Sequence, residues 1–510
     1  MNGFSAVVTT GIYCRPGCGG RPLPANVRPF PNPAAAEAAG FRACLRCRPY
    51  RTDLPMPWAG TELVCRAVQL ILDGALDAGN EAELGARLGI SPRHLRRLFE
   101  EQVGATPDQV ARSRRTHFAR RLLDDTDLSI TDIAFAAGFG SVRQFNRASQ
   151  EVFRATPGEL RARRRVSDRL VADGGLTLRL GFSPPLAWEP MLAYLKARAI
   201  AGVEHVSGGT YRRTVAIDGD PGVIELSPGG PDHLVLRAHL PHWEGLIHHV
   251  QRARRIFNLD ADVAGATEHL AGAMGTAGRD RPAQVRLLGA LMAAVPGLRP
   301  PGTWDPFETG VRAILGQQVS VAGAGTLMAR LVGRHGVPVP GLGPVGLTCL
   351  FPSPEALAEA DLSGLGLTTT REAAVRNFAA AVARGAIELD RSRSLGEFEA
   401  AITATAGLGP WTAHYLALRM GEPDAFPASD LGLRRALAAP TSRPIGSAEA
   451  AAMAEPWRPY RAFAATHLWL AAAGGVTQPT SRYRSRLNSA LTRSAATSSP
   501  GLADQAAVSG

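Results

Sequence analysis

"AGLGPWTAHYLALRMGEPDAFPASDLGLRRAL", residues 406–437, decides how the C-terminal part of this chain must fold. Gly407 and Gly409 interrupt a helical pattern, so we expect a tight hairpin between two helices. Glycines at such a turn let the backbone N–H groups of the second helix approach a phosphate closely. Asp430 stands directly before another helical run, a position where an aspartate is often only an N-cap. The stretch therefore predicts a helix–hairpin–helix followed by a carboxylate at a helix start.

This combination resembles the helix-hairpin-helix and Gly/Pro-Asp motif of the base-excision DNA glycosylases. The hairpin and "FPASD" at 426–430 carry the resemblance together. It implies that Asp430 is the catalytic acid, whose carboxylate stabilises the charge growing on the deoxyribose or orients the attacking water. It also implies that Gly407 and Gly409 contact DNA. Bifunctional relatives carry a lysine where Trp411 stands here, so we expect base release by hydrolysis without strand cleavage.

The region from about residue 176 to 472 is similar to the AlkA subgroup, the 3-methyladenine DNA glycosylase II family. Three segments carry this resemblance: "PPLAWEPMLAYLKARAIAGVE" (184–204), "FETGVRAILGQQVSVAGA" (307–324) and "WRPYRAFAATHLWL" (457–470). Enzymes of this family flip the damaged base out of the DNA helix and fill the gap with an apolar side chain. The matching residue here is Gln318, which has an amide instead. The family's aromatic base pocket maps onto Tyr194, Trp411, Tyr415 and Trp469. Each of these aromatic residues, taken alone, is equally typical of a hydrophobic core.

The chemistry of alkylated bases explains why such a pocket suits them. Alkylation at N3 or N7 makes a purine cationic, and a cation stacks on an aromatic face with about 0.5 to 2 kcal/mol per contact. A cationic purine is also a good leaving group, so one carboxylate suffices for catalysis. The base must first be flipped out of the helix. We therefore expect excision of alkylated bases such as 3-methyladenine from double-stranded DNA.

A second motif, "TTGIYCRPGC" at residues 9–18, opens a cysteine-rich segment. Four of the six cysteines lie within the first 47 residues, in the spacing Cys14-x3-Cys18, 25 residues, and Cys44-x2-Cys47. Two close pairs separated by a loop are what a tetrahedral four-thiolate zinc site requires. Stray core cysteines or an iron–sulfur cluster are the alternatives. A region this small and rich in loops could hardly fold without a metal.

Residues 8–49 and the helical block after them closely resemble the N-terminal domain of Ada, a DNA methyl-repair family. The resemblance implies one zinc ion held by Cys14, Cys18, Cys44 and Cys47, and transfer of a methyl group from a DNA methylphosphotriester to Cys14. Zinc keeps a thiol deprotonated and nucleophilic. Methylation removes one negative charge and so weakens repulsion of DNA phosphates. Only thirteen residues precede Cys14, fewer than the family has. The alternative is that Cys14 is only a structural zinc ligand and never accepts a methyl group.

Two helix-turn-helix patterns follow, at 81–107 and 130–157. The pair resembles the AraC-family DNA-binding domain, whose helices reach base edges and phosphates in the major groove. The outward-facing polar positions that we expect to contact DNA are Arg93, His94, Arg97, Arg143, Gln144 and Arg147. The second unit departs from the family at Ser149, Gln150 and Arg154, where an aromatic residue, a basic residue and glycine are usual. A solvated basic helix face is the alternative.

The bulk composition fits these motifs. A chain of 510 residues is too long for one hydrophobic core, and the formal net charge of +11 suits a nucleic acid partner. No run approaches the roughly 18 apolar residues of a membrane span, and no signal peptide opens the chain, so we expect a cytoplasmic monomer without membrane contact. No "PCHR"-type motif of the O6-methylguanine transferase domain occurs, so direct repair of that lesion is not expected.

We therefore expect a multidomain, mainly α-helical chain that combines a small zinc domain with an AraC-type double helix-turn-helix, an α+β AlkA N-terminal domain and an all-α helix-hairpin-helix glycosylase domain. The expected boundaries are 1–53, 60–165, 175–280 and 281–476, with a disordered tail at 477–510. The function that we expect is repair of DNA alkylation by base excision, together with a methyl acceptor that regulates transcription. The contrasting hypothesis is an alkylation-responsive transcription regulator whose glycosylase half is weak or inactive.

Overall fold

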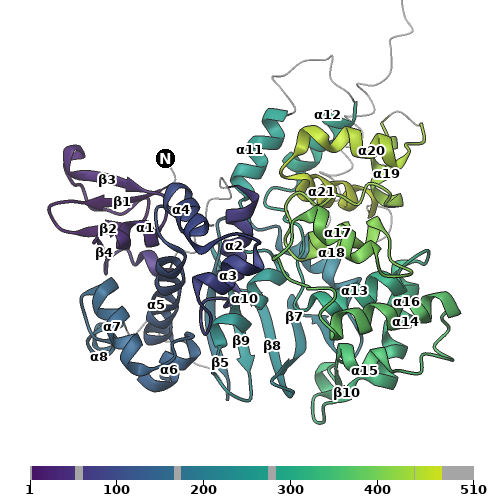
Figure 1. The fold of residues 1–510 in the computed structure, drawn as a ribbon, viewed down its shortest axis with the longest axis horizontal. Coiled ribbons are helices and arrows are strands. Elements are labelled where there is room, and N and C mark those ends of the chain that lie inside the picture. Colours follow the sequence, from purple (N-terminus) through teal and green to yellow (C-terminus); the bar gives the residue numbers. More distant parts are fainter. Residues whose placement is uncertain are drawn as a thin grey trace, which may run out of the picture.

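The computed structural model describes residues 3–51, 61–165, 170, 174–273, 283–440 and 443–473. The tail expected at 477–510 lies outside these residues. In Figure 1 a small sheet lies at one end of the molecule and a helical block lies at the other, with a five-stranded sheet between them. Within the described ranges, no helix combines the length and the apolar character that a bilayer crossing requires.

The N-terminal sheet has the strand order β3-β1-β2-β4. Its elements are β1 (Phe4–Val7), β2 (Ile12–Cys14), β3 (Val27–Phe30), β4 (Arg42–Ala43) and α1 (Pro33–Ala38). The short lead-in before Cys14 supplies β1, which pairs antiparallel with both β2 and β3. Phe4 is buried and its ring meets Tyr13 edge-on, with the centroids 5.9 Å apart. The few residues before Cys14 thus form a central strand.

Two consecutive helix-turn-helix units follow, as the sequence predicts. The helices of this region are α2 (Glu62–Leu72), α3 (Glu81–Arg87), α4 (Pro92–Gln102), α5 (Pro107–Asp125), α6 (Ile130–Ala136), α7 (Val142–Phe153) and α8 (Pro157–Ala162). Ser91 caps α4 by accepting the His94 N–H, and Ser141 caps α7 by accepting the Gln144 N–H, both at 3.2 Å. Each cap satisfies a backbone donor that has no partner inside its helix.

The departures of the second unit are accommodated locally. Ser149 is buried and donates its hydroxyl to the Ala155 carbonyl at 2.9 Å, so burial leaves this polar group satisfied. Arg154 ends α7 in the left-handed conformation, with φ of 56°, a conformation that glycine adopts without strain. The unit therefore forms with an arginine at this position, at a cost in backbone strain.

The central antiparallel sheet has the order β5-β9-β8-β7-β6. Its strands are β5 (Leu176–Gly181), β6 (Glu204–Ser207), β7 (Thr210–Ile217), β8 (Asp220–Pro228) and β9 (His233–His239), and its helices are α9 (Trp188–Lys196), α10 (Leu246–Ile256) and α11 (Val263–Ala273). Short alternating runs at 176–182, 211–217, 222–226 and 233–240 predict β5, β7, β8 and β9 from the sequence. β6 is short and mostly polar, so neither length nor alternation predicts it.

The C-terminal block is helical apart from a two-stranded ribbon. Its elements are α12 (Ala283–Ala294), α13 (Pro306–Leu315), α14 (Val321–His335), β10 (Val337–Pro338), β11 (Cys349–Leu350), α15 (Pro354–Ala358), α16 (Thr369–Ala383), α17 (Leu395–Thr403), α18 (Pro410–Arg419), α19 (Leu431–Ala438), α20 (Ser447–Ala454) and α21 (Arg461–Ala473). The hairpin predicted around Gly407 joins α17 to α18, and Asp430 directly precedes α19.

Two apolar clusters hold the chain together. One runs continuously from the N-terminal sheet through the second helix-turn-helix unit and the central sheet to α21. The other is confined to the first helix-turn-helix unit, with α2, the start of α5 and Ala34. The first unit thus has a core of its own.

Candidate functional site

Asp430 is both a helix cap and the centre of a hydrogen-bonded cluster. Its Oδ1 accepts the Leu433 N–H at 3.0 Å, which caps α19. The same oxygen accepts the indole N–H of Trp469, and Oδ2 accepts that of Trp411, each at 3.0 Å. Oδ1 thus has two donors and Oδ2 has one. A carboxylate oxygen can accept two hydrogen bonds, so Oδ2 keeps capacity for a further partner.

The predicted aromatic residues lie together beside this carboxylate. Trp411 and Tyr415 stack with centroids 5.2 Å apart and an interplanar angle of 7°, because they are one helical turn apart on α18. Trp469 of α21 meets Tyr415 edge-on at 6.0 Å. The hydroxyl of Tyr194, from α9, lies 3.3 Å from that of Tyr415. Three segments far apart in the sequence therefore build one aromatic cluster around Asp430.

Two arginines support the tyrosines. Arg419 donates to the Tyr415 hydroxyl at 3.0 Å, and the Arg198 guanidinium lies 3.8 Å from the centre of the Tyr194 ring. Burial raises the pKa of Tyr415, but the charges of Arg419 and Arg198 outweigh it and lower that pKa to about 8. The sequence interpretation did not include these arginines. Each follows its tyrosine by four residues, Arg419 on the same helix and Arg198 just after the end of α9, a spacing that could have indicated the contact.

Gly432 is another residue that the sequence interpretation missed. A Cβ at this position would lie 3.0 Å from Asp430 Oδ1 and 3.5 Å from the Trp469 ring. Any larger side chain would therefore press on the contact between the carboxylate and the indole. The glycine lets α19 and α21 approach closely at the point where Asp430 sits.

The hairpin and the turn before α14 lie next to each other. Gly407 has a φ of 90°, and a Cβ there would lie 2.5 Å from that of Ala374, so only glycine fits. Gly409 is the N-cap of α18. Gln317 donates to the Gly407 carbonyl at 3.4 Å, which ties the turn at 316–320 to the hairpin. Gln318, next along this turn, is exposed in the left-handed conformation with φ of 57°.

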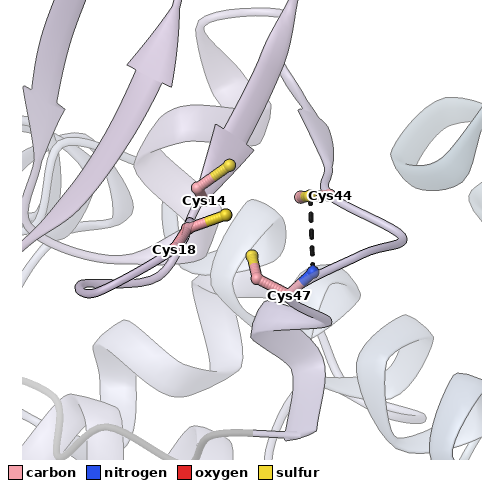
Figure 2. A group of neighbouring side chains, drawn as sticks. All are labelled: Cys14, Cys18, Cys44 and Cys47. Carbon is pink, nitrogen blue, oxygen red and sulfur yellow. Dashed lines mark hydrogen bonds between the residues drawn. The ribbon is translucent and has the colours of Figure 1, made fainter. Parts of the chain in front are cut away.

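The four cysteines form a second site, at the edge of the N-terminal sheet. Figure 2 shows Cys14 and Cys18 facing Cys44 and Cys47, with all four sulfur atoms turned toward a common centre. The Sγ atoms lie within 4.8 Å of one another. Tetrahedral zinc with Zn–S bonds of about 2.3 Å needs sulfurs about 3.8 Å apart, a separation that this cluster can provide. Cys44 is buried, whereas Cys14 is half-buried and open to reaction.

The four thiols affect one another's protonation. A hydrogen bond to Cys47, together with burial and the neighbouring thiolates, raises the pKa of Cys14 far above its usual value. The same hydrogen bond lowers the pKa of Cys47 to about 5. Without a cation the cluster therefore favours one thiolate at the expense of another. Four thiolates together fit a divalent, thiophilic metal, and zinc meets that requirement.

The side chains predicted to read DNA lie on α4 and α7, away from the elements that carry Asp430. Arg93, Arg97, Arg143 and Arg147 are exposed, and His94 is partly exposed. Gln144 is exposed too, but its side-chain oxygen accepts the Gly140 N–H at 3.0 Å. His94 lies 3.1 Å from Arg97 on the same helix. Both helices thus present polar side chains to solvent.

Four family models match successive parts of the chain. They are the metal-binding domain of Ada at residues 2–50, a helix-turn-helix domain at 84–163, the AlkA N-terminal domain at 177–305 and the HhH-GPD superfamily of base excision DNA repair proteins at 311–454. A protein named "Probable bifunctional transcriptional activator/DNA repair enzyme AlkA", from Mycobacterium tuberculosis, is 40% identical over 93% of both chains. The chain belongs to this family of bifunctional activator/repair proteins.

Two further relatives match separate parts of the chain. DNA-3-methyladenine glycosylase 2 of Escherichia coli is 33% identical over 57% of this chain and 95% of its own length. The bifunctional transcriptional activator/DNA repair enzyme Ada of the same organism is 33% identical over 31% of this chain and 43% of its own length. This member of the family is therefore a DNA glycosylase joined to a zinc domain and an AraC-type helix-turn-helix domain, and it binds DNA.

Proposed function

We propose that the C-terminal half is a monofunctional 3-methyladenine DNA glycosylase of type II, with Asp430 as its catalytic carboxylate. The observation that carries this proposal is the position of Asp430, which two indole N–H groups hold at 3.0 Å beside a cluster of stacked aromatic rings. A fixed carboxylate next to π-faces suits a cationic base whose departure leaves positive charge on the sugar.

The residues have distinct roles in this reaction. A flipped cationic purine stacks against Trp411, Tyr415, Trp469 and Tyr194. The bond between C1′ and the base nitrogen breaks, and its electron pair leaves with the base, which departs neutral. The Asp430 carboxylate stabilises the charge that develops on the deoxyribose. Water then attacks C1′, and Oδ2, which has spare acceptor capacity, takes the proton of that water before releasing it to solvent.

The exposed residues near Asp430 suit a DNA-facing surface. We propose that Gly407 and Gly409 hold the phosphate backbone, and that Gln318 fills the gap left by the flipped base. The hydrogen bond between Gln317 and the Gly407 carbonyl supports this, because it keeps the two turns in register. Trp411 occupies the position where bifunctional relatives carry a lysine, so no amine is available there for a Schiff base.

Release of free base from alkylated duplex DNA tests this function. We expect the full chain to release 3-methyladenine and leave an intact abasic strand. Asp430→Asn keeps the helix cap and should lose activity by on the order of 10²-fold or more, the scale seen when one transition-state contact is removed. A wild-type chain that binds alkylated DNA without releasing 3-methyladenine would contradict the proposal, and would favour the regulator with an inactive glycosylase half.

We propose a second function for the N-terminal half, because Cys14 lies in a cluster of four cysteines and is more exposed than Cys44, which is buried. Zinc held by the four cysteines supplies a thiolate at neutral pH. Cys14 Sγ attacks the methyl carbon of a DNA methylphosphotriester, the C–O bond breaks, and the phosphate leaves as an ordinary diester anion. The loss of negative charge at the cluster then strengthens binding of promoter DNA through α4 and α7.

Methyl transfer can be followed by mass. Incubation with methylphosphotriester DNA should add one methyl group to the peptide that contains Cys14, and a promoter footprint should then strengthen. Cys14→Ser should abolish both effects, whereas Cys349→Ser, remote from the cluster, should change neither. A chain that carries one zinc ion but never acquires the methyl group would leave Cys14 a structural ligand.

A further inference from the structure

The first helix-turn-helix unit is docked on the glycosylase half through a buried arginine. Arg66 of α2 is buried, and its guanidinium donates to the Arg391 carbonyl at 3.3 Å and to the Ser392 carbonyl. These carbonyls belong to the loop before α17, more than 300 residues further along the chain. A buried guanidinium that depends on another domain for its partners costs free energy when the domains separate. The contact is therefore a specific interface.

Ion pairs surround this arginine at the rim. Arg87 of α3 pairs with Asp390 at 2.7 Å. On the side of the central sheet, Asp77 lies 2.7 Å from His248 of α10, and Asp73 pairs with Arg255. The first unit has a separate apolar core, so polar contacts dominate its attachment to the glycosylase half. A polar interface of this kind joins domains that can also come apart.

The loop that Arg66 contacts is connected directly to the segment that ends at Asp430. The guanidinium of Arg391 donates to the Gly421 carbonyl and to the Glu422 carboxylate, both at 2.6 Å. Glu422 in turn accepts the Asp424 N–H at 3.1 Å. These residues follow α18, which carries Trp411, and they begin the stretch 421–430 that places the carboxylate. A continuous set of contacts thus runs from α2 to the start of the segment between α18 and Asp430.

A cavity marks the same junction. Its volume is about 990 Å³, and Glu62 and Cys65 of α2 form part of its wall. Trp411, Pro427 and Ser429 also line it, so it reaches the indole that holds Asp430 and the residue next to Asp430. The first helix-turn-helix unit and the segment before Asp430 therefore share the walls of one cavity.

We propose that Arg66 is a positioning residue for base excision: by docking α2 on the 390–392 loop, it holds Trp411 and the 421–430 segment so that Asp430 is correctly placed. The inference rests on the proposed glycosylase function. It makes the DNA-binding half a structural part of the enzyme, and it means that events which loosen α2 lower the rate of excision. Arg66 touches neither the base pocket nor the recognition side chains.

The experiment compares Arg66→Ala with the wild-type full chain in two measurements. The first is the rate at which a thiol reagent modifies Cys65, read by mass spectrometry of its peptide. In the docked protein this rate should be low, because burial, partly offset by the charge of Arg391, raises the pKa of Cys65 to about 11. The second is single-turnover release of 3-methyladenine at saturating enzyme, with affinity for abasic duplex measured alongside.

We expect Arg66→Ala to speed modification of Cys65 and to slow base release by about 10- to 100-fold, the scale of a small misplacement of a catalytic group. Affinity for abasic duplex should stay unchanged, and Arg66→Lys should recover part of the rate. Arg87→Ala removes an exposed ion pair with Asp390 at the rim, so it should speed modification of Cys65 and slow base release only weakly. This variant keeps the test valid if Arg66→Ala fails to fold. The matched control is Arg334→Ala, which removes an arginine that donates to the Ser363 carbonyl inside one domain.

Two outcomes would overturn the inference. One is faster modification of Cys65 with an unchanged rate of base release, which would show that loosening α2 does not affect catalysis. The other is unchanged modification in Arg66→Ala, which would show that Arg66 does not hold the interface. A wild-type chain that releases no base overturns the glycosylase function instead, and the Cys65 measurement still reports whether α2 is docked.

Discussion

The indole N–H of Trp411 lies 3.0 Å from Oδ2 of Asp430 and joins the helix after the hairpin to the start of α19. The tryptophan thereby has two functions at once, since its ring also stacks on Tyr415. We propose that Trp411, at the position where bifunctional relatives carry a lysine, orients the carboxylate.

Trp411→Phe separates these two functions, because phenylalanine keeps the ring and loses the donor. A hydrogen bond to a charged group contributes about 1.5–3 kcal/mol, so we expect base release to slow by about 10- to 100-fold. Single-turnover release of 3-methyladenine measures this, with Trp243→Phe as a control outside the cluster. An unchanged rate in Trp411→Phe would mean that the ring alone matters.

Gln318 can be tested without introducing backbone strain. Gln318→Gly removes the side chain and tolerates the φ of 57°. Flipping a base costs a few kcal/mol, so loss of the side chain that fills the gap should weaken binding of a duplex with an abasic analogue by about fivefold or more. Gln318→Asn keeps an amide and also tolerates this conformation, and it should restore part of the affinity. Equal affinities for all three proteins would exclude a role in filling the gap.

The zinc site predicts a loss of stability when a buried ligand is removed. We expect one zinc ion per chain, and none after dialysis of Cys44→Ser, because three thiolates bind the ion less tightly than four. Binding of structural zinc contributes about 10–16 kcal/mol in small zinc domains, so the N-terminal sheet should become sensitive to protease. Zinc content and digestion at Tyr13 report the two effects. Cys65→Ser, outside the cluster, should retain the metal.

His467 predicts a pH dependence of stability. It is buried on α21, and burial lowers its pKa from 6.5 to about 4. The unfolded chain therefore binds a proton in this range that the folded chain does not. The stability contribution of neutral His467 is fully present above pH 6.5, and about 3 kcal/mol of it is lost as the pH falls to 4. Denaturant unfolding at pH 7 and pH 5 should show a smaller loss for His467→Phe than for the wild type. An identical loss in both proteins would assign the pH dependence to other groups.

The local motifs of this protein can be predicted from its sequence because each depends on residues close together in the chain. Gly407 determines the hairpin through backbone freedom, and Ser91 and Ser141 start their helices through short-range capping. The cysteine pairs indicate a metal site because a four-thiolate cluster needs little more than two close pairs. β6 is the exception, since its four residues, three of them polar, form a strand only by pairing with β7.

The sequence alone also determined which residues are chemically suited to the proposed site, but only the tertiary structure decided how they meet. Trp411 and Trp469 donate to one carboxylate because α21 packs on α19 and the tertiary fold brings Trp411 of α18 to the start of α19, and no spacing in the chain encodes that. The contact of Arg66 with a loop more than 300 residues away is equally invisible in sequence. Long-range contacts of this kind depend on how whole domains pack, which is set by the shape and burial of many side chains together.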